Sequence, residues 1–150
     1  MEVEAVNQLM TQGVPFNRVL SLRVVAVAPE RTEVMIPEAP ERLNHVGTAH
    51  AAVEFGLGDA TSGTMVIAAF GDLQNQGYVP LVASAHITYL KPAKGELRGV
   101  ASLDLATQQR VRSDVQSNGK ARFSVPVEIR DANGTVVAEM VVEWALVKPR

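Results

Sequence analysis

The chain contains 150 residues, of which 47% are hydrophobic and 20% charged, and this composition excludes a collagen, a coiled coil and an intrinsically disordered chain. The formal net charge of −2 argues against broad binding to nucleic acid or to an anionic membrane. The absence of cysteine excludes disulfides, thiolate metal sites and a cysteine nucleophile.

The first third of the chain predicts one short helix and two strands. Apolar residues at helical spacing predict a helix over residues 2–12. β-Branched residues predict a strand over 19–28, and a turn leads to a second strand over 32–36. The segment 37–44 contains two prolines and predicts irregular structure.

Residues 48–70 contain no proline and are rich in alanine, which predicts a helix about 33 Å long at 1.5 Å per residue. This helix contains Gly56, Gly58 and Gly63, each of which costs about 1 kcal/mol relative to alanine in a helix interior. Such a cost is acceptable where another surface must approach the helix backbone closely. A curved sheet wrapped around the helix would make that approach.

The rest of the chain predicts antiparallel strands joined by tight turns. Asn118-Gly119 is typical of a hairpin turn, and the polar segment 109–116 gives the weakest strand signal. Strands are expected over 79–90, 96–108, 109–116, 121–130 and 135–147. Helices and strands are segregated, so the predicted class is α+β, with one curved antiparallel sheet around the long helix. The uncovered sheet edge predicts dimerisation.

The polar residues that could carry chemistry gather at the start of the long helix. If Thr48 caps the helix, the first backbone N–H groups, including that of Ala51, are free to polarise a carbonyl oxygen. Asp59 lies two turns further along, where a carboxylate is costly to bury unless it has a function. The other candidates are Asn44, His45, Gly47, His50 and Glu54.

Simpler interpretations apply to several of these residues. His50 and Glu54 are four residues apart and are expected to form a surface pair. A lone strand histidine such as His86 is more often structural than a ligand. The three histidines show no metal-binding spacing, so no metal site is expected, and no serine lies in a G-x-S-x-G elbow.

A family resemblance rests on Asn44, His50, Phe55, Leu57 and Asp59, which follow the spacing N-x5-H-x4-F-x-L-x-D, and on His-Ile-Thr-Tyr-Leu-Lys-Pro-Ala at 86–93. This pattern resembles that of hotdog-fold thioesterases of the phenylacetate-degradation (PaaI-like) kind, whose signature typically reads N-x5-H-G-G-x2-F-x-L-A-D/E. The resemblance implies a single hotdog domain over 1–150, with an N-terminal helical extension over 1–15. This chain has alanines at 51 and 52 where the family has two glycines.

The resemblance also implies roles for individual residues. Asp59 matches the acid that acts as nucleophile or as general base, and the N–H of Ala51 matches the group that polarises the thioester carbonyl. Asn44 matches a residue that positions the water or the carboxylate, and His50 shapes the helix start. The substrate-binding candidates are Gly47, Thr48, Ser62, His86, Lys91 and Lys94. Further candidates for contacts with the CoA phosphates are Arg98, Arg110 and Arg112.

We therefore expect an acyl-CoA thioesterase acting on a small or medium acyl group. It would need no cofactor, and it would be a cytoplasmic homodimer, or a dimer of dimers, without nucleic-acid or membrane partners. The main alternative is a non-catalytic acyl-CoA-binding hotdog protein, which the Ala-for-Gly changes favour. A hotdog dehydratase or hydratase ranks last, because the required pairing of histidine and acid is absent at the helix start.

Overall fold

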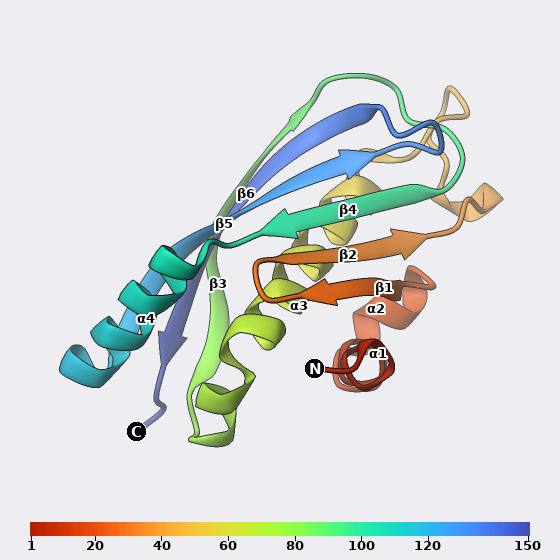
Figure 1. Ribbon diagram of the computed structural model, residues 1–150. Helices are drawn as coiled ribbons and strands as arrows, with labels where there is room; N and C mark the ends of the chain where they lie inside the picture. The colour runs from red at the N-terminus through yellow and green to blue at the C-terminus, as the bar shows by residue number, and fades with distance from the viewer.

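The computed structural model describes residues 1–150, and its framework is a six-stranded antiparallel sheet in the order β1-β2-β4-β5-β6-β3 (Figure 1). The strands are β1 (Arg23–Ala28), β2 (Arg31–Ile36), β3 (Val79–Tyr89), β4 (Leu97–Ser102), β5 (Lys120–Arg130) and β6 (Val136–Val147). The sheet curves around one long helix, α3 (Ala51–Asn75). The expected α+β hotdog arrangement is confirmed.

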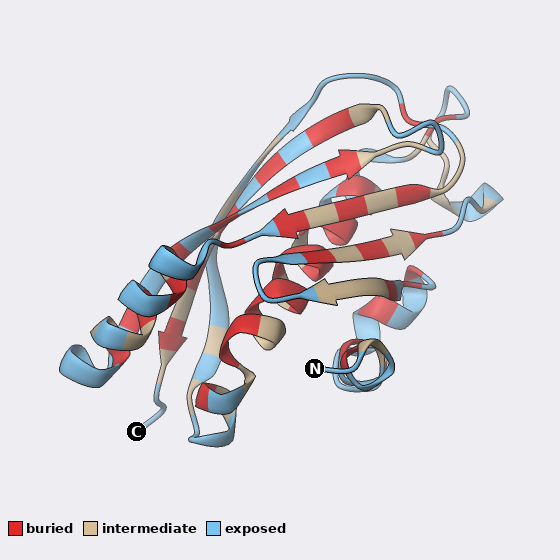
Figure 2. Cartoon of the chain, viewed as in Figure 1, coloured by how far each residue is buried: buried red, intermediate tan, exposed pale blue.

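The inner face of the sheet and α3 together form the core. Buried and exposed residues alternate along β5, so one face of this strand is buried and the other is open to solvent (Figure 2). The glycines of α3 allow the close packing that the sequence predicts. A Cβ at position 58 would overlap the sulfur of Met140 in β6, and Gly99 of β4 leaves room for Thr61 of the helix.

The segment between β4 and β5 is wrongly predicted as strand and is a helix, α4 (Leu105–Asn118). The side chain of Asp104 caps its first turn by accepting a hydrogen bond from the N–H of Thr107. Gly119 has a φ of 72° and ends the helix as a left-handed C-terminal residue, so the predicted hairpin turn does not form. Val111 and Val115, four residues apart, are its buried apolar contacts.

The bounds of the first predicted strand and of the long helix also change. The helix over 2–12 is confirmed as α1 (Val3–Gln12), but α2 (Pro15–Val19) takes the start of the predicted first strand. A short 3-10 helix, η1 (Pro40–Arg42), lies in the proline-containing segment. The long helix begins later than predicted, because His50 rather than Thr48 is its N-terminal cap. Its backbone is kinked at Phe70 (φ −133°, ψ 18°), the last residue of the predicted helix, and residues 71–75 add a further helical turn beyond the kink.

The two edges of the sheet differ in their cover. At the β1 edge, the N–H of Val24 donates to the side chain of Asn7 from α1 at 2.9 Å. At the other edge, β3 is largely exposed over its eleven residues, including Leu81 (53% exposed) and Val82 (43% exposed). A long exposed edge strand is a template for pairing with another strand. None of the helices has the length and apolar character needed to span a membrane.

Candidate active site at the start of α3

The loop before α3 is organised by the side chain of Asn44. Its Oδ1 accepts hydrogen bonds from the N–H groups of Val46 (3.0 Å) and Thr48 (3.1 Å), and its Nδ2 donates to the Thr48 hydroxyl at 2.8 Å. Gly47 adopts a φ of 77°, which other residues rarely adopt, and Thr48 is buried. The structure thus brings these three predicted residues together as the support of the helix start.

The first turn of α3 presents one free backbone N–H group. The side chain of His50 accepts a hydrogen bond from the N–H of Ala52 at 3.0 Å through Nδ1. The His50 carbonyl oxygen accepts two more, from Val53 (2.9 Å) and Glu54 (3.2 Å). The exposed N–H of Ala51 donates to no group of the chain.

The surroundings of this N–H group favour binding of a negative oxygen. Ala51 N–H shares a peptide unit with the His50 carbonyl, and the two hydrogen bonds to that carbonyl polarise the unit. The group also lies at the positive end of α3, whose helical backbone runs unbroken from Ala51 to Ala69. A carbonyl oxygen that gains negative charge during a reaction would be stabilised here.

Two lysines lie in the loop that borders this turn. The Ala49 N–H donates to the Ala93 carbonyl oxygen at 2.9 Å, which holds residues 91–95 against the helix start. Lys91 and Lys94 flank the buried Ala93, and both are exposed. Neither forms an ion pair within the chain, so both are free to attract an anionic group.

Asp59 lies about two turns further along α3 than Ala51. It is half-buried, and burial raises the pKa of its carboxyl. It shares a helix face with Ala52 and Phe55, seven and four residues before it, and Phe55 is 39% exposed. Asp59 follows Ala51 by eight residues, a rise of about 12 Å along the helix. A carbonyl group bound to the Ala51 N–H would therefore be beyond the reach of Asp59 from the same chain.

Two of the predicted substrate-binding residues lie away from this surface. Ser62 is fully buried; its hydroxyl donates to the Asp59 carbonyl oxygen at 2.8 Å and accepts from Trp144 Nε1 at 3.0 Å, so it links α3 to β6. His86 pairs with the exposed Val141 of β6, whereas the next residue pairs with the buried Met140. His86 therefore lies on the outer face of the sheet, away from α3.

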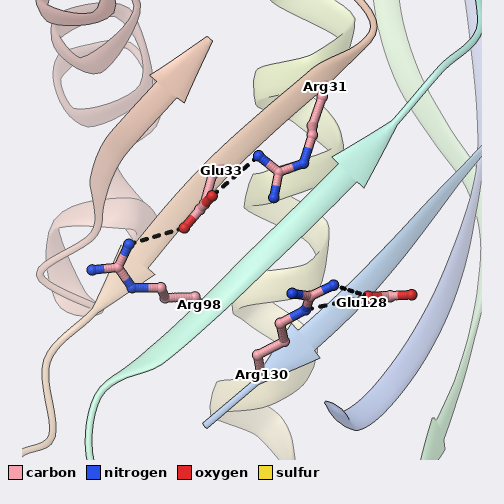
Figure 3. Close-up of polar contacts among 5 residues, drawn as sticks. All are labelled: Arg31, Glu33, Arg98, Glu128 and Arg130. Carbon is pink, nitrogen blue, oxygen red and sulfur yellow. Dashed lines mark hydrogen bonds and ion pairs between the residues drawn. The ribbon is translucent and has the colours of Figure 1, made fainter. Parts of the chain in front are cut away.

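The three arginines proposed for phosphate contacts are each paired with acids. Arg98 bonds Glu33 at 2.9 Å and Glu96 at 3.0 Å, and Figure 3 shows its contact with Glu33 beside β2 and β4. The remaining pairs are Arg110 with Asp114 and Arg112 with Asp72. These pairs make all three weaker candidates than the two free lysines.

The environment of Glu54 differs from the one that the sequence predicts. It is 4% exposed, so the expected surface pair with His50 is wrong. Burial raises the pKa of its carboxyl to about 7, and its Oε1 is buried without a hydrogen-bond partner. The pKa of the Tyr89 hydroxyl is also raised, chiefly by its own burial and to a smaller extent by the negative charge of Glu54. A helical spacing from Leu57 and Thr61, both fully buried, is the sequence signal that places Glu54 on the inner face.

Comparison with known proteins identifies the family. No curated protein matches the sequence. A Pseudomonas aeruginosa protein of unknown function, PA5026, described as a probable thioesterase, is 25% identical with a TM-score of 0.86, over 99% of this chain and 97% of that one. Protein OLEI01261 from Chlorobaculum tepidum, of unknown function, is 15% identical with a TM-score of 0.87, over 98% and 94%.

An enzyme is also among the similar structures. A mutant of the thioesterase SAV0944 from Staphylococcus aureus is 14% identical with a TM-score of 0.71, over 91% of this chain and 100% of that one. The sequence matches the domain of unknown function DUF4442 over residues 3–146. The chain therefore belongs to the DUF4442 family, and it shares its hotdog fold with structures described as thioesterases.

Proposed function

We propose that the protein hydrolyses acyl-CoA thioesters with a small or medium acyl group. The observation that carries this proposal is the unpaired, polarised N–H of Ala51 at the exposed start of α3. A thioester carbonyl placed there would have its developing negative charge stabilised by a preorganised donor. The thioesterase names of similar structures support the same reaction class.

The proposed enzyme is a homodimer in which each site uses two chains. Because Ala51 and Asp59 of one chain are about 12 Å apart along the helix, Asp59 would come from the partner. The exposed edge of β3 supplies a surface for pairing, since a two-fold axis would bring two copies of this strand together. An acyl-CoA would then bind between the two helices.

In the proposed reaction, Asp59 takes a proton from water, and the water oxygen bonds to the carbonyl carbon. The electron pair of the carbonyl moves onto its oxygen, which Ala51 N–H stabilises. The carbonyl re-forms as the C–S bond breaks, and the proton held by Asp59 passes through water to the departing sulfur, which releases the carboxylic acid and the thiol and restores the Asp59 carboxylate. Direct attack by the Asp59 carboxylate is the alternative first step. Lys91 and Lys94 would attract the CoA phosphates.

The test is hydrolysis of a panel of acyl-CoAs by the wild-type protein and by Asp59→Asn. We expect the wild type to release thiol from at least one small or medium acyl-CoA. Asp59→Asn should lose this activity and keep its fold and its oligomeric state. Full hydrolysis by Asp59→Asn would contradict the role of the carboxylate.

A non-catalytic acyl-CoA-binding protein is the second candidate. The methyl groups of Ala51 and Ala52, at positions that are glycine in the PaaI-like signature, narrow the approach to the helix start. Saturable binding of an acyl-CoA without thiol release at any pH would favour this alternative.

A further inference from the structure

The buried carboxyl of Glu54 has no hydrogen-bond or ion-pair partner within its own chain. The residue is only 4% exposed to solvent, yet Oε1 lacks a hydrogen-bond partner. None of the ion pairs of the chain includes this residue. A buried carboxyl without a partner costs free energy, so a purely structural role would be poorly served by glutamate at this position.

The position of Glu54 places it beside the free N–H group. Residues three apart on a helix are neighbours, with about 5–6 Å between their Cβ atoms, so Glu54 lies next to Ala51. Helical side chains lean towards the N-terminus, which directs the Glu54 side chain towards the first turn of α3. Tyr89, whose hydroxyl donates to the Ala51 carbonyl oxygen at 2.9 Å, lies close enough to sense its charge.

Glu54 and Asp59 cannot do the same task from one chain. They are five residues apart, about 7.5 Å along the helix and about 140° around it. Glu54 lies on the inner face and is buried, whereas Asp59 is half-buried on the face it shares with the exposed Phe55. In the proposed dimer, a site made from the Ala51 of one chain would receive Asp59 from its partner and Glu54 from the same chain as Ala51.

We propose that Glu54 is a second catalytic residue, which gives a proton to the sulfur of the departing thiol. This proposal rests on the proposed thioesterase function. As the C–S bond breaks, its electron pair moves onto sulfur and the Glu54 proton is transferred to that sulfur. The proton that Asp59 took from the attacking water then passes through solvent water to the Glu54 carboxylate, so both acids return to their starting forms and the net reaction remains thioester plus water to acid plus thiol. A carboxyl that is still protonated close to neutral pH is suited to donate a proton.

The leaving group provides the test, because an acidic thiol leaves without help from a proton donor. Two thioesters with the same acyl group are compared, one of CoA and one of an aromatic thiol such as 5-thio-2-nitrobenzoate. We expect Glu54→Gln to lower kcat for the CoA thioester by about 10²–10⁴-fold and to leave the aryl thioester nearly unaffected. Asp59→Asn should lower both rates. Glu139→Gln, an exposed change on the outer face of β6, serves as the matched control.

The outcomes separate the two proposals. An equal loss on both thioesters, or no loss on either, overturns the role of Glu54 while the wild-type activity keeps the thioesterase proposal intact. A wild type that hydrolyses neither thioester overturns both proposals.

A measurement on the wild type avoids dependence on the folding of the variant. The solvent deuterium isotope effect on kcat should be larger for the CoA thioester than for the aryl thioester, since only the CoA thioester adds the proton transfer from Glu54 to the transfer from water to Asp59. Equal isotope effects for the two thioesters would also overturn the inference.

Discussion

The hydroxyl of Tyr89 donates a hydrogen bond to the carbonyl oxygen of Ala51 at 2.9 Å. This bond links the last residue of the edge strand β3 to the first residue of α3. The strand that we expect to pair with a second chain is thus joined directly to the turn that carries the proposed carbonyl-binding N–H. Pairing of two chains would therefore hold this turn in place, and it would also bring Asp59 of one chain to Ala51 of the other.

Replacing Tyr89 by phenylalanine removes this bond and keeps the ring. We expect a loss of about 0.5–1 kcal/mol in the free energy of unfolding, because a partly exposed neutral hydrogen bond contributes little. We expect kcat for hydrolysis to fall by a larger proportion than the free energy of unfolding, because the first turn of α3 gains conformational freedom. Urea unfolding and kcat measured on the same preparation check this. If the variant has an unchanged kcat and the expected loss of stability, the hydrogen bond of Tyr89 to the first turn does not contribute to the activity.

The buried carboxyl of Glu54 makes stability depend on pH. Its folded-state pKa is raised to about 7 from 4.5, so between these values the unfolded chain is ionised while the folded chain still holds the proton. Stability should therefore fall as the pH rises from about 4.5 to 7, by on the order of 1–3 kcal/mol, and level off above. Glu54→Gln should remove this decline, and denaturant titrations at pH 5 and pH 8 measure it. An unchanged pH dependence in the variant would contradict the burial of this group.

The glycines of α3 provide a matched pair of substitutions. Gly58→Ala places a methyl group against the sulfur of Met140, so the side chain must move, and we expect a loss of about 1–3 kcal/mol. Gly63→Ala meets Met10 and Trp144 at an ordinary 3.7 Å and should gain up to about 1 kcal/mol from helix propensity. Thermal unfolding of the two variants shows whether each substitution raises or lowers the stability. A gain in both would mean that the sheet tolerates a wider helix.

Leu81 tests the proposed pairing of β3. It is 53% exposed in the edge strand, and Leu81→Lys places a charge where two copies would meet. We expect a monomer with a normal fold and without hydrolysis, because a single chain cannot bring Asp59 to Ala51. Light scattering after size exclusion measures the mass. Val19→Lys, on the 68% exposed Val19 of α2, is the control, and a dimeric Leu81→Lys would exclude this edge from the interface.

The sequence predicts the part of the fold that its spacing encodes. The glycine- and alanine-rich character of α3 and the alternation in β5 and β6 follow from packing requirements that act on each segment separately. Helix α4 is missed because its surface is polar and only Val111 and Val115 mark a buried face of helical period. Asn118-Gly119 is ambiguous by itself, since a left-handed glycine ends a helix as readily as it turns a hairpin.

The candidate site is predictable to the same extent. The spacing of Asn44 and His50 places both at the start of the helix, where each uses its side chain to hold the turn. The burial of Glu54 and of Ser62 depends on how the sheet curves over the helix. No local sequence pattern predicts this curvature. Lys91 and Lys94 differ from the arginines in lacking an acidic partner. The pair of Arg110 with Asp114 is local to α4, whereas the pairs of Arg98 with Glu33 and of Arg112 with Asp72 join segments distant in the sequence.

Proline at position 51 separates the proposed carbonyl-binding N–H from every other feature of the helix. Proline is well suited to the first position of a helix, and Ala51 N–H makes no hydrogen bond that would be lost. The residue before it, His50, already has the extended backbone (φ −66°, ψ 139°) that a following proline requires. The fold should therefore tolerate Ala51→Pro with a change of less than about 1 kcal/mol.

Hydrolysis should respond quite differently to Ala51→Pro. Removal of one preorganised donor to the developing oxyanion lowers kcat by about 10²–10³-fold in comparable sites. Ala52→Pro is the contrasting variant, because it removes the hydrogen bond to His50 Nδ1 and should lower stability as well. Thiol release by Ala51→Pro at the wild-type rate, with the fold intact by circular dichroism, would show that the carbonyl is polarised elsewhere. Since substrate binding does not need this N–H before negative charge develops, KM should change far less than kcat.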